Sequence, residues 1–298
     1  MHTVRRMQAS CTPAVMMRTL GAAKILSENR DAFSGKVRLV FQPGEEIGKG
    51  AKPFVAAGVL EGAERVFGLH TAYDLEAGTV GLKPGINNAA VDHFRIRVHG
   101  KSTHVSTPHL GVDALYIASQ IVVAVQGLVT RCTSPTEPVI IGVGKLNAGT
   151  TYNAVAAFAE MEGTTRTISQ ESRDRVRAQV SETAQSIAAL YGGTAEVEWT
   201  DFAAALVNDP QVCEEAARVV DELLGAGHVV TDRELSLSGD NFAEFELYKP
   251  GAYAYLGTGN PDLPHTMITN HNGGFDVDEN ALVTGAGLYV GYTVARLG

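Results

Sequence analysis

One segment of the sequence, residues 89–201, most constrains how this chain can fold. Alternating apolar residues there predict strands, and longer apolar or amphipathic stretches predict helices. In chain order these elements are predicted at residues 94–98 (strand), 112–131 (helix), 139–143 (strand), 154–167 (strand), 170–191 (helix) and 195–199 (strand). The six elements form a self-contained unit in the order β-α-β-β-α-β, which is the ferredoxin-like pattern.

The residues on either side of this segment follow a different pattern. A strand is predicted at residues 36–41 (KVRLVF), a helix at residues 51–60 and a second strand at residues 65–69. This succession predicts a βαβ unit and a parallel sheet. Similar elements follow at residues 209–224, 251–256 and 281–296. We therefore predict an α/β protein in which a discontinuous domain, residues 1–88 and 202–298, carries an inserted domain, residues 89–201.

The composition excludes several classes of protein. A length of 298 residues fits two domains at the usual ~100–200 residues each. With 24 basic and 33 acidic side chains the net charge is −9, which argues against non-specific binding to nucleic acid. No apolar run approaches the ~20 residues of a membrane span. Cys11, Cys132 and Cys213 are widely spaced and odd in number, which predicts free thiols and a cytoplasmic location.

Candidate metal ligands follow two predicted strands of the discontinuous domain. Glu45 and Glu46 come shortly after residues 36–41, and His70 comes directly after residues 65–69. In parallel sheets, binding and catalytic residues lie beyond the carboxyl ends of the strands. Two adjacent carboxylates repel each other unless a cation or proton lies between them. One carboxylate and the imidazole would bind a metal, and the other carboxylate would act as general base on its water. A solvated acidic loop beside a core histidine explains these residues equally well.

Two further histidines lie in loops where chemistry is plausible. His271, in NHNGGF, is either a third metal ligand or a surface histidine. His104, in GKSTH, follows a strand, and its imidazole is either a donor to a developing oxyanion or an ordinary turn residue. The residues alone leave both alternatives open.

Taken together, the motifs are specific. The chain contains FQPGEE at residues 41–46, GLH at 68–70, GKSTH at 100–104, GTTYN at 149–153, GTTRT at 163–167 and NHNGGF at 270–275. In these motifs it resembles the metal-dependent amidohydrolases and metallopeptidases that include hippurate hydrolase, N-acyl-amino-acid amidohydrolases and the indole-acetyl-amino-acid hydrolases of plants. The resemblance covers residues 21–298 and implies a zinc-peptidase-like catalytic domain with a mixed or parallel sheet.

The resemblance also implies a role for each candidate in the catalytic domain. Glu45 would be the general base and proton shuttle. Glu46, His70 and His271 would bind a divalent metal, Zn²⁺ or Mn²⁺, of which the family binds two. The substrate would be an N-acyl amino acid or a small peptide-like amide, and neither nucleic acid nor a membrane would be a partner.

The inserted domain has its own implied roles. Residues 89–201 would form a homodimer, so that His104 would reach the active site of a partner subunit and stabilise the oxyanion there. Asn153 would help to position substrate, and Arg166 would be a further substrate-binding residue.

The sequence departs from the family before Gly21. The family has a Met-His-Ala-Cys-Gly-His-Asp-x-His segment there, whose cysteine and second histidine bind metal, and further strands and helices precede it. This chain has SCTPAVMMRT at residues 10–19 instead. The codons TCA TGC ACG CCT GCG GTC ATG ATG CGC ACN for this stretch encode Met-His-Ala-Cys-Gly-His-Asp-Ala-His when read from the last base of the first codon. We therefore expect an out-of-frame start and a catalytic domain without its N-terminal part, which sequencing of the gene tests.

Three functions stay open at this point. The first is an amidohydrolase with a reduced site of Glu46, His70 and His271, because three protein ligands and a water suffice for catalytic zinc. The second is a catalytically impaired dimer that binds ligand and holds one metal or none. The third is a related dipeptidase or deacetylase with the same machinery and a different pocket.

Overall fold

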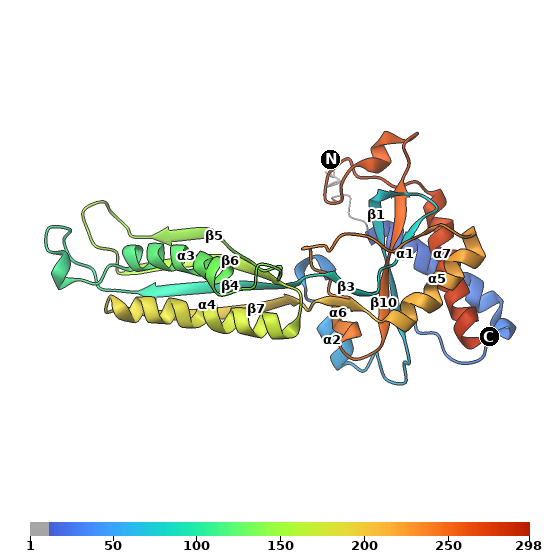
Figure 1. The fold of residues 1–298 in the computed structure, drawn as a ribbon, viewed down its shortest axis with the longest axis horizontal. Helices are drawn as coiled ribbons and strands as arrows, with labels where there is room; N and C mark the ends of the chain where they lie inside the picture. Colours follow the sequence, from blue (N-terminus) through green and yellow to red (C-terminus); the bar gives the residue numbers. More distant parts are fainter. Residues whose placement is uncertain (1–11) are drawn as a thin grey trace, which may run out of the picture.

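The computed structural model describes residues 12–298, with side chains from Met16 onward. Figure 1 shows two bodies side by side, an elongated one built around β4–β7 and a second one built around β1 and β10. Two short strands join them, β3 (Gly85–Asn88) and β8 (Leu206–Asn208), which pair antiparallel. The inserted domain therefore leaves the rest of the chain through a narrow two-stranded connection.

The inserted domain has the predicted ferredoxin-like fold. Its elements are β4 (Ala90–His99), α3 (Ala114–Arg131), β5 (Ile140–Ala148), β6 (Phe158–Thr167), α4 (Gln170–Leu190) and β7 (Thr194–Ala203). The strands pair antiparallel in the order β5-β6-β4-β7. Phe94, Ile96 and Val98 alternate along β4 and are fully buried against α3 and α4. Because only one face of the strand is buried, its apolar residues recur at every second position, which made the strand predictable.

Helix α3 is the one described helix that is long and apolar enough to cross a membrane. Its buried residues Ile117, Ile121 and Val125 pack in the core of the inserted domain. Residues four apart lie on one face of a helix, so this face covers the sheet as a core helix does.

The second body is a mixed sheet with helices packed on it. Strand β1 (Val66–Glu76) pairs parallel with β10 (Gly251–Gly259), which pairs antiparallel with β2 (Val80–Gly81), and β2 pairs parallel with β9 (Val229–Val230). The helices α1 (Thr12–Glu28), α5 (Pro210–Leu224) and α7 (Asn280–Leu297) pack together on one side of β1 and β10 (Figure 1). Leu69, Leu256 and Leu288 are among the buried residues of their shared core. The short helices are α2 (Ala51–Ala56) and α6 (Ala243–Glu246).

The predicted strand at residues 36–41 is not formed. This stretch forms no ladder with any described strand, and Val37, Leu39 and Phe41 are about 40% exposed (38%, 38% and 41%). A strand needs a neighbour to pair its backbone groups. The parallel neighbour of β1 is β10, which lies far along the chain. The prediction of a parallel pairing was therefore correct, but the predicted partner, residues 36–41, was wrong.

The expectations about the start of the chain fall largely on residues 1–11, including Cys11, which lie outside the described residues. Helix α1 begins at Thr12, and its Arg18 side chain is fully buried and donates to the Leu69 carbonyl at 3.3 Å. Cys132 is exposed and Cys213 is buried, and both are free thiols as predicted.

Glu246 ties α6 to the connection between the two bodies. Its carboxylate accepts a hydrogen bond from the Val207 backbone N–H of β8 at 3.0 Å. Burial, with smaller contributions from the charges of Asp240 and Asp209, raises the pKa of Glu246 to about 8. The folded protein therefore favours the protonated carboxyl, whereas an unfolded chain ionises near the ordinary value of about 4.3.

Glu246→Gln is expected to flatten the pH dependence of stability. Because the folded pKa is raised, the contribution of Glu246 is complete below about pH 4 and is lost as the pH rises through about 8. Between pH 5.5 and 8.5 the wild-type free energy of unfolding should fall relative to the variant, by on the order of 2 kcal/mol. Urea unfolding across this range measures the difference. Glu222→Gln, exposed on α5, is the control, and parallel profiles for wild type and E246Q would contradict the prediction.

Candidate metal centre and substrate cavity

Five of the seven predicted site residues line one cavity of about 710 Å³, which has walls from both bodies. The body around β1 and β10 contributes Glu45, Glu46, His70 and His271, and the inserted domain contributes Arg166 from β6. These residues are up to 226 positions apart along the chain, from Glu45 to His271. The fold therefore brings together in one cavity five of the residues that the motifs singled out.

The two adjacent carboxylates lie in a single 3₁₀ turn, Glu45–Ile47. Gly44 and Gly48 flank this turn with left-handed φ values of 69° and 65°. Glycine adopts this conformation without the steric cost that a Cβ would add. The two glycines thus allow a tight turn at which Glu45 is half-buried while the Glu46 side chain is 45% exposed.

Crowded negative charge surrounds Glu45. Burial first, then the nearby charges of Asp240 and Glu46, raises the pKa of Glu45 to about 7, while His70 acts in the opposite direction. Asp240 is itself held in place, because the buried Tyr253 hydroxyl donates to it at 2.5 Å and the Phe242 N–H donates at 2.8 Å. Such a concentration of carboxylates favours a bound cation or proton.

The two histidines reach the cavity from β1 and from a C-terminal loop. His70 lies on β1, and its Nδ1–H donates to the Thr71 carbonyl at 2.6 Å, which assigns the lone pair to Nε2. His271 is the only non-glycine residue among the described ones with a positive φ, 63°. This turn brings its Nδ1 to 3.6 Å from a carboxylate oxygen of Glu46.

These donors fit a divalent metal in kind. Carboxylate oxygens and neutral imidazoles are ligands of Zn²⁺ and Mn²⁺. The raised pKa of Glu45 reflects its burial first and the nearby charges of Asp240 and Glu46 second. Within the described part of the chain, no three His, Cys, Asp or Glu side chains converge into a ready metal-binding group. Glu46 and His271 lie 3.6 Å apart, and His70 lines the same cavity.

Arg166 carries the positive charge that the inserted domain presents to the cavity. Other cations on the same face of the sheet are paired, as Arg97 is with Glu160 and Glu198. Arg166 is half-buried, burial lowers its pKa, and it makes no ion pair with a described residue. A partly desolvated guanidinium of this kind is suited to hold a carboxylate.

The other two predicted residues, His104 and Asn153, lie elsewhere. They are exposed on loops that meet beyond the end of β4 farthest from β3, where the Val105 N–H donates to the Asn153 carbonyl at 3.1 Å. The His104 Nδ1 lies 2.7 Å from the Ser106 hydroxyl. Neither residue lines the cavity of its own chain. The structure thus separates the predicted residues into a cavity group and a group at the tip of the inserted domain.

Sequence reasoning missed several residues of the cavity wall. Asp240 lies outside the motifs that singled out the other residues, and its contact with Tyr253 depends on the folded chain. Arg233 lies over the Tyr255 ring at 4.7 Å and pairs with Asp74 at 3.1 Å, so its charge is already compensated. No local pattern marks these residues, because each acquires its place from a strand or loop distant in the sequence.

Comparison with known proteins places the chain in a family. Residues 15–294 match the model of peptidase family M20/M25/M40. The chain is 38% identical to an N-acetyl-L-cysteine deacetylase of Bacillus subtilis over 264 residues, which cover 89% of this chain and 61% of that relative. It is 36% identical to a thermostable carboxypeptidase of Saccharolobus solfataricus, over 90% of this chain and 67% of that one. The chain thus spans about two thirds of the length of these relatives.

A solved structure agrees with this placement. A dinuclear metal-binding peptidase of the M20 family from Bacillus subtilis superimposes with a TM-score of 0.79 and 31% identity, over 95% of this chain and 71% of that chain. The fold and the resemblance expected from the motifs are both confirmed by these matches. The chain is therefore a member of peptidase family M20/M25/M40.

Proposed function

We propose that this chain carries out metal-dependent hydrolysis of the amide bond in N-acyl amino acids. The observation that carries the proposal is the cavity in which the Glu45–Glu46 turn, His70, His271 and Arg166 come together. The names of relatives support it, since they include a deacetylase, a carboxypeptidase and a dinuclear metal-binding peptidase.

Each cavity residue has a role in this proposal. Glu46, His70 and His271 hold a divalent metal, Zn²⁺ or Mn²⁺. A bound metal of this kind polarises the substrate carbonyl and lowers the pKa of water. Glu45 takes the proton of the attacking water and returns it to the leaving amine, a role that its place beside Glu46 in the same cavity supports. Arg166 binds the carboxylate of the amino acid.

His104 and Asn153 enter the proposal through a second copy of the chain. Both are exposed at the tip of the inserted domain and do not line the cavity of their own chain. In a homodimer formed through residues 89–201, His104 of each copy donates to the oxyanion in the other, and Asn153 helps to position substrate. We place the enzyme in the cytoplasm, where free Cys132 and Cys213 stay reduced.

Metal content and substrate profiling test the proposed function. Elemental analysis after loading with Zn²⁺ or Mn²⁺ should find bound metal, and N-acetyl or hippuryl amino acids should be hydrolysed. Faster hydrolysis of dipeptides would indicate the related dipeptidase instead. Ligand binding with neither metal nor turnover would overturn the proposal in favour of a non-catalytic dimer.

Removing a proposed ligand is expected to weaken metal binding at least about 100-fold. Even residues that only hydrogen-bond to a metal ligand typically contribute about 10–100-fold to metal affinity. His70→Ala and His271→Ala are the test variants, and calorimetric titration with Zn²⁺ is the measurement. His93→Ala is a matched control, because His93 lines the same cavity but lies 3.1 Å from Glu162. Equal losses in all three variants would contradict the ligand assignment.

A further inference from the structure

The turn that carries Glu45 and Glu46 packs directly on a strand of the inserted domain. A Cβ placed on Gly48, the residue that ends the turn, would lie 2.7 Å from the Phe202 carbonyl oxygen and 2.8 Å from its ring. Phe202 belongs to β7 and lines the cavity. Only glycine permits such a close approach of two backbones, so the position of this turn depends on the position of β7.

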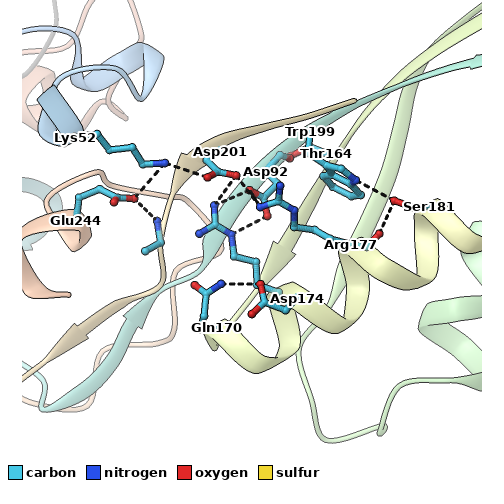
Figure 2. A network of polar contacts seen from close by, with 12 residues as sticks. Lys52, Asp92, Thr164, Gln170, Asp174, Arg177, Ser181, Trp199, Asp201 and Glu244 are labelled. Carbon is cyan, nitrogen blue, oxygen red and sulfur yellow. Dashed lines mark hydrogen bonds and ion pairs between the residues drawn. The ribbon is translucent and has the colours of Figure 1, made fainter. Parts of the chain in front are cut away.

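An ion pair forms a second contact between the same two segments, four residues after Gly48. Lys52, in α2, places its Nζ 3.2 Å from a carboxylate oxygen of Asp201, the neighbour of Phe202 in β7. The same Nζ lies 3.9 Å from Glu244 of α6, whose carboxylate also accepts the Ala204 N–H at 3.2 Å. Figure 2 shows Lys52 between the two carboxylates. Lys52 therefore connects the segment after the acidic turn both to the inserted domain and to α6.

Asp201 is in turn held within the inserted domain. Arg177 lies 2.7 Å and Arg173 3.6 Å from its carboxylate. Arg173 donates two hydrogen bonds, of 2.6 and 2.9 Å, to the carboxylate of Asp92 in β4. These ion pairs hold the Asp201 carboxylate against two arginines of α4, one of which is itself bound to β4.

The links of this network differ in strength because they differ in burial. The side chains of Asp92 and Arg173 are 1% and 6% exposed, whereas those of Lys52 and Asp201 are 42% and 40% exposed. Exposed pairs are weak and screened by salt, while a buried bidentate pair is costly to break. The pair between Lys52 and Asp201 is therefore the weak link, and it lies between the two bodies.

We propose that Lys52 is a positioning residue, which couples the Glu45–Glu46 turn to the orientation of the inserted domain. It does not line the cavity, so its effect passes through the Gly48–Phe202 contact and the ion pair with Asp201. With the pair formed, the turn and β7 move as one. With the pair broken, the turn keeps only the Gly48–Phe202 contact and is held less tightly to the inserted domain. The importance of this coupling for catalysis rests on the proposed function, but the coupling itself does not.

Hydrogen exchange of the metal-free protein tests the coupling without any need for turnover. The probes are the amides of the turn, including Gly48, which donates to the Glu45 carbonyl at 2.8 Å, and Lys49, which donates to Gly44 at 3.1 Å. Lys52→Met and Asp201→Asn are each expected to lower the protection of residues 45–52 about two- to fivefold, the size of an exposed ion pair. The double variant should lose no more than either single one. Lys52→Arg should retain protection.

The matched control is Lys49→Met. Lys49 is exposed in the same segment and forms no ion pair with a described residue, so its removal should leave the exchange unchanged. In 1 M NaCl, where the Debye length is about 3 Å, the wild type should exchange like K52M. Unchanged protection in K52M and D201N, or equal losses in K49M, would overturn the proposal. Because no metal or substrate is present, failure here is distinguishable from failure of the proposed hydrolysis.

Discussion

Glu45→Gln is expected to lower kcat for hydrolysis of an N-acyl amino acid about 10²–10⁴-fold, the usual contribution of a positioned general base. Glutamine has the same shape and still accepts a hydrogen bond, but it cannot take a proton from water. The turn that holds residue 45 is set by Gly44 and Gly48 and should persist in the variant. Steady-state kinetics of the metal-loaded protein, with the metal content determined in parallel, measure the effect.

The separation of roles between the two adjacent carboxylates makes this result specific. Glu45→Gln should leave the metal content unchanged, whereas Glu46→Gln should lower it, because Glu46 lies beside His271. The exposed Glu61 provides a neutral control as Glu61→Gln. Wild-type kcat in E45Q, or loss of metal from E45Q alone, would reject the assignment of Glu45 as general base.

Arg173→Met is expected to destabilise the inserted domain by about 3–5 kcal/mol. The Asp92 carboxylate is 1% exposed, and Arg173 neutralises it through two hydrogen bonds. Although burial lowers the pKa of Arg173, the hydrogen bonds and charge of Asp92 outweigh burial and raise it. Methionine keeps the apolar stem but leaves a buried charge without its main partner. Urea unfolding followed by the fluorescence of Trp199, in β7, measures the loss.

A second variant separates the cost of the orphaned charge from the cost of packing. The pair Asp92→Asn and Arg173→Met removes both charges and should recover a large part of the loss, because a buried pair itself stabilises little. Arg218→Met, which breaks an exposed pair with Glu214 on α5, should change the free energy of unfolding by less than about 0.5 kcal/mol. A cost of R173M as small as that of R218M would show that the buried pair is not needed for stability.

The inserted domain was predictable because its signals are local. Phe94, Ile96 and Val98 repeat every second residue on β4, and Ile117, Ile121 and Val125 repeat every fourth on α3. Each repeat reports which side of an element faces the core, and one β-α-β-β-α-β unit supplies all its own strand partners. The order of these elements was therefore sufficient to predict the fold of the inserted domain.

The body around β1 and β10 was less predictable because its strands pair with distant segments. Residues 36–41 alternate as well as β4 does, yet no described strand pairs with them. The parallel partner of β1 is β10, 185 positions further on where Val66 meets Gly251. Alternation shows that a segment has two unlike faces, but it does not show where a partner comes from.

The sequence by itself determined the local elements of this protein and the chemical kinds of residue at its site. Adjacent carboxylates in FQPGEE and imidazoles in GLH and NHNGGF suited either metal chemistry or a solvated loop with ordinary histidines, and only the resemblance to the family favoured metal. Only the tertiary structure decided which groups meet. Arg166 joins the cavity while His104 stays outside it, and Lys52 reaches Asp201 across 149 positions. Burial and the nearby charge of Asp240 raise the pKa of Glu45. The reason is that elements form from interactions a few residues apart, whereas charge and burial act through space and depend on the completed fold.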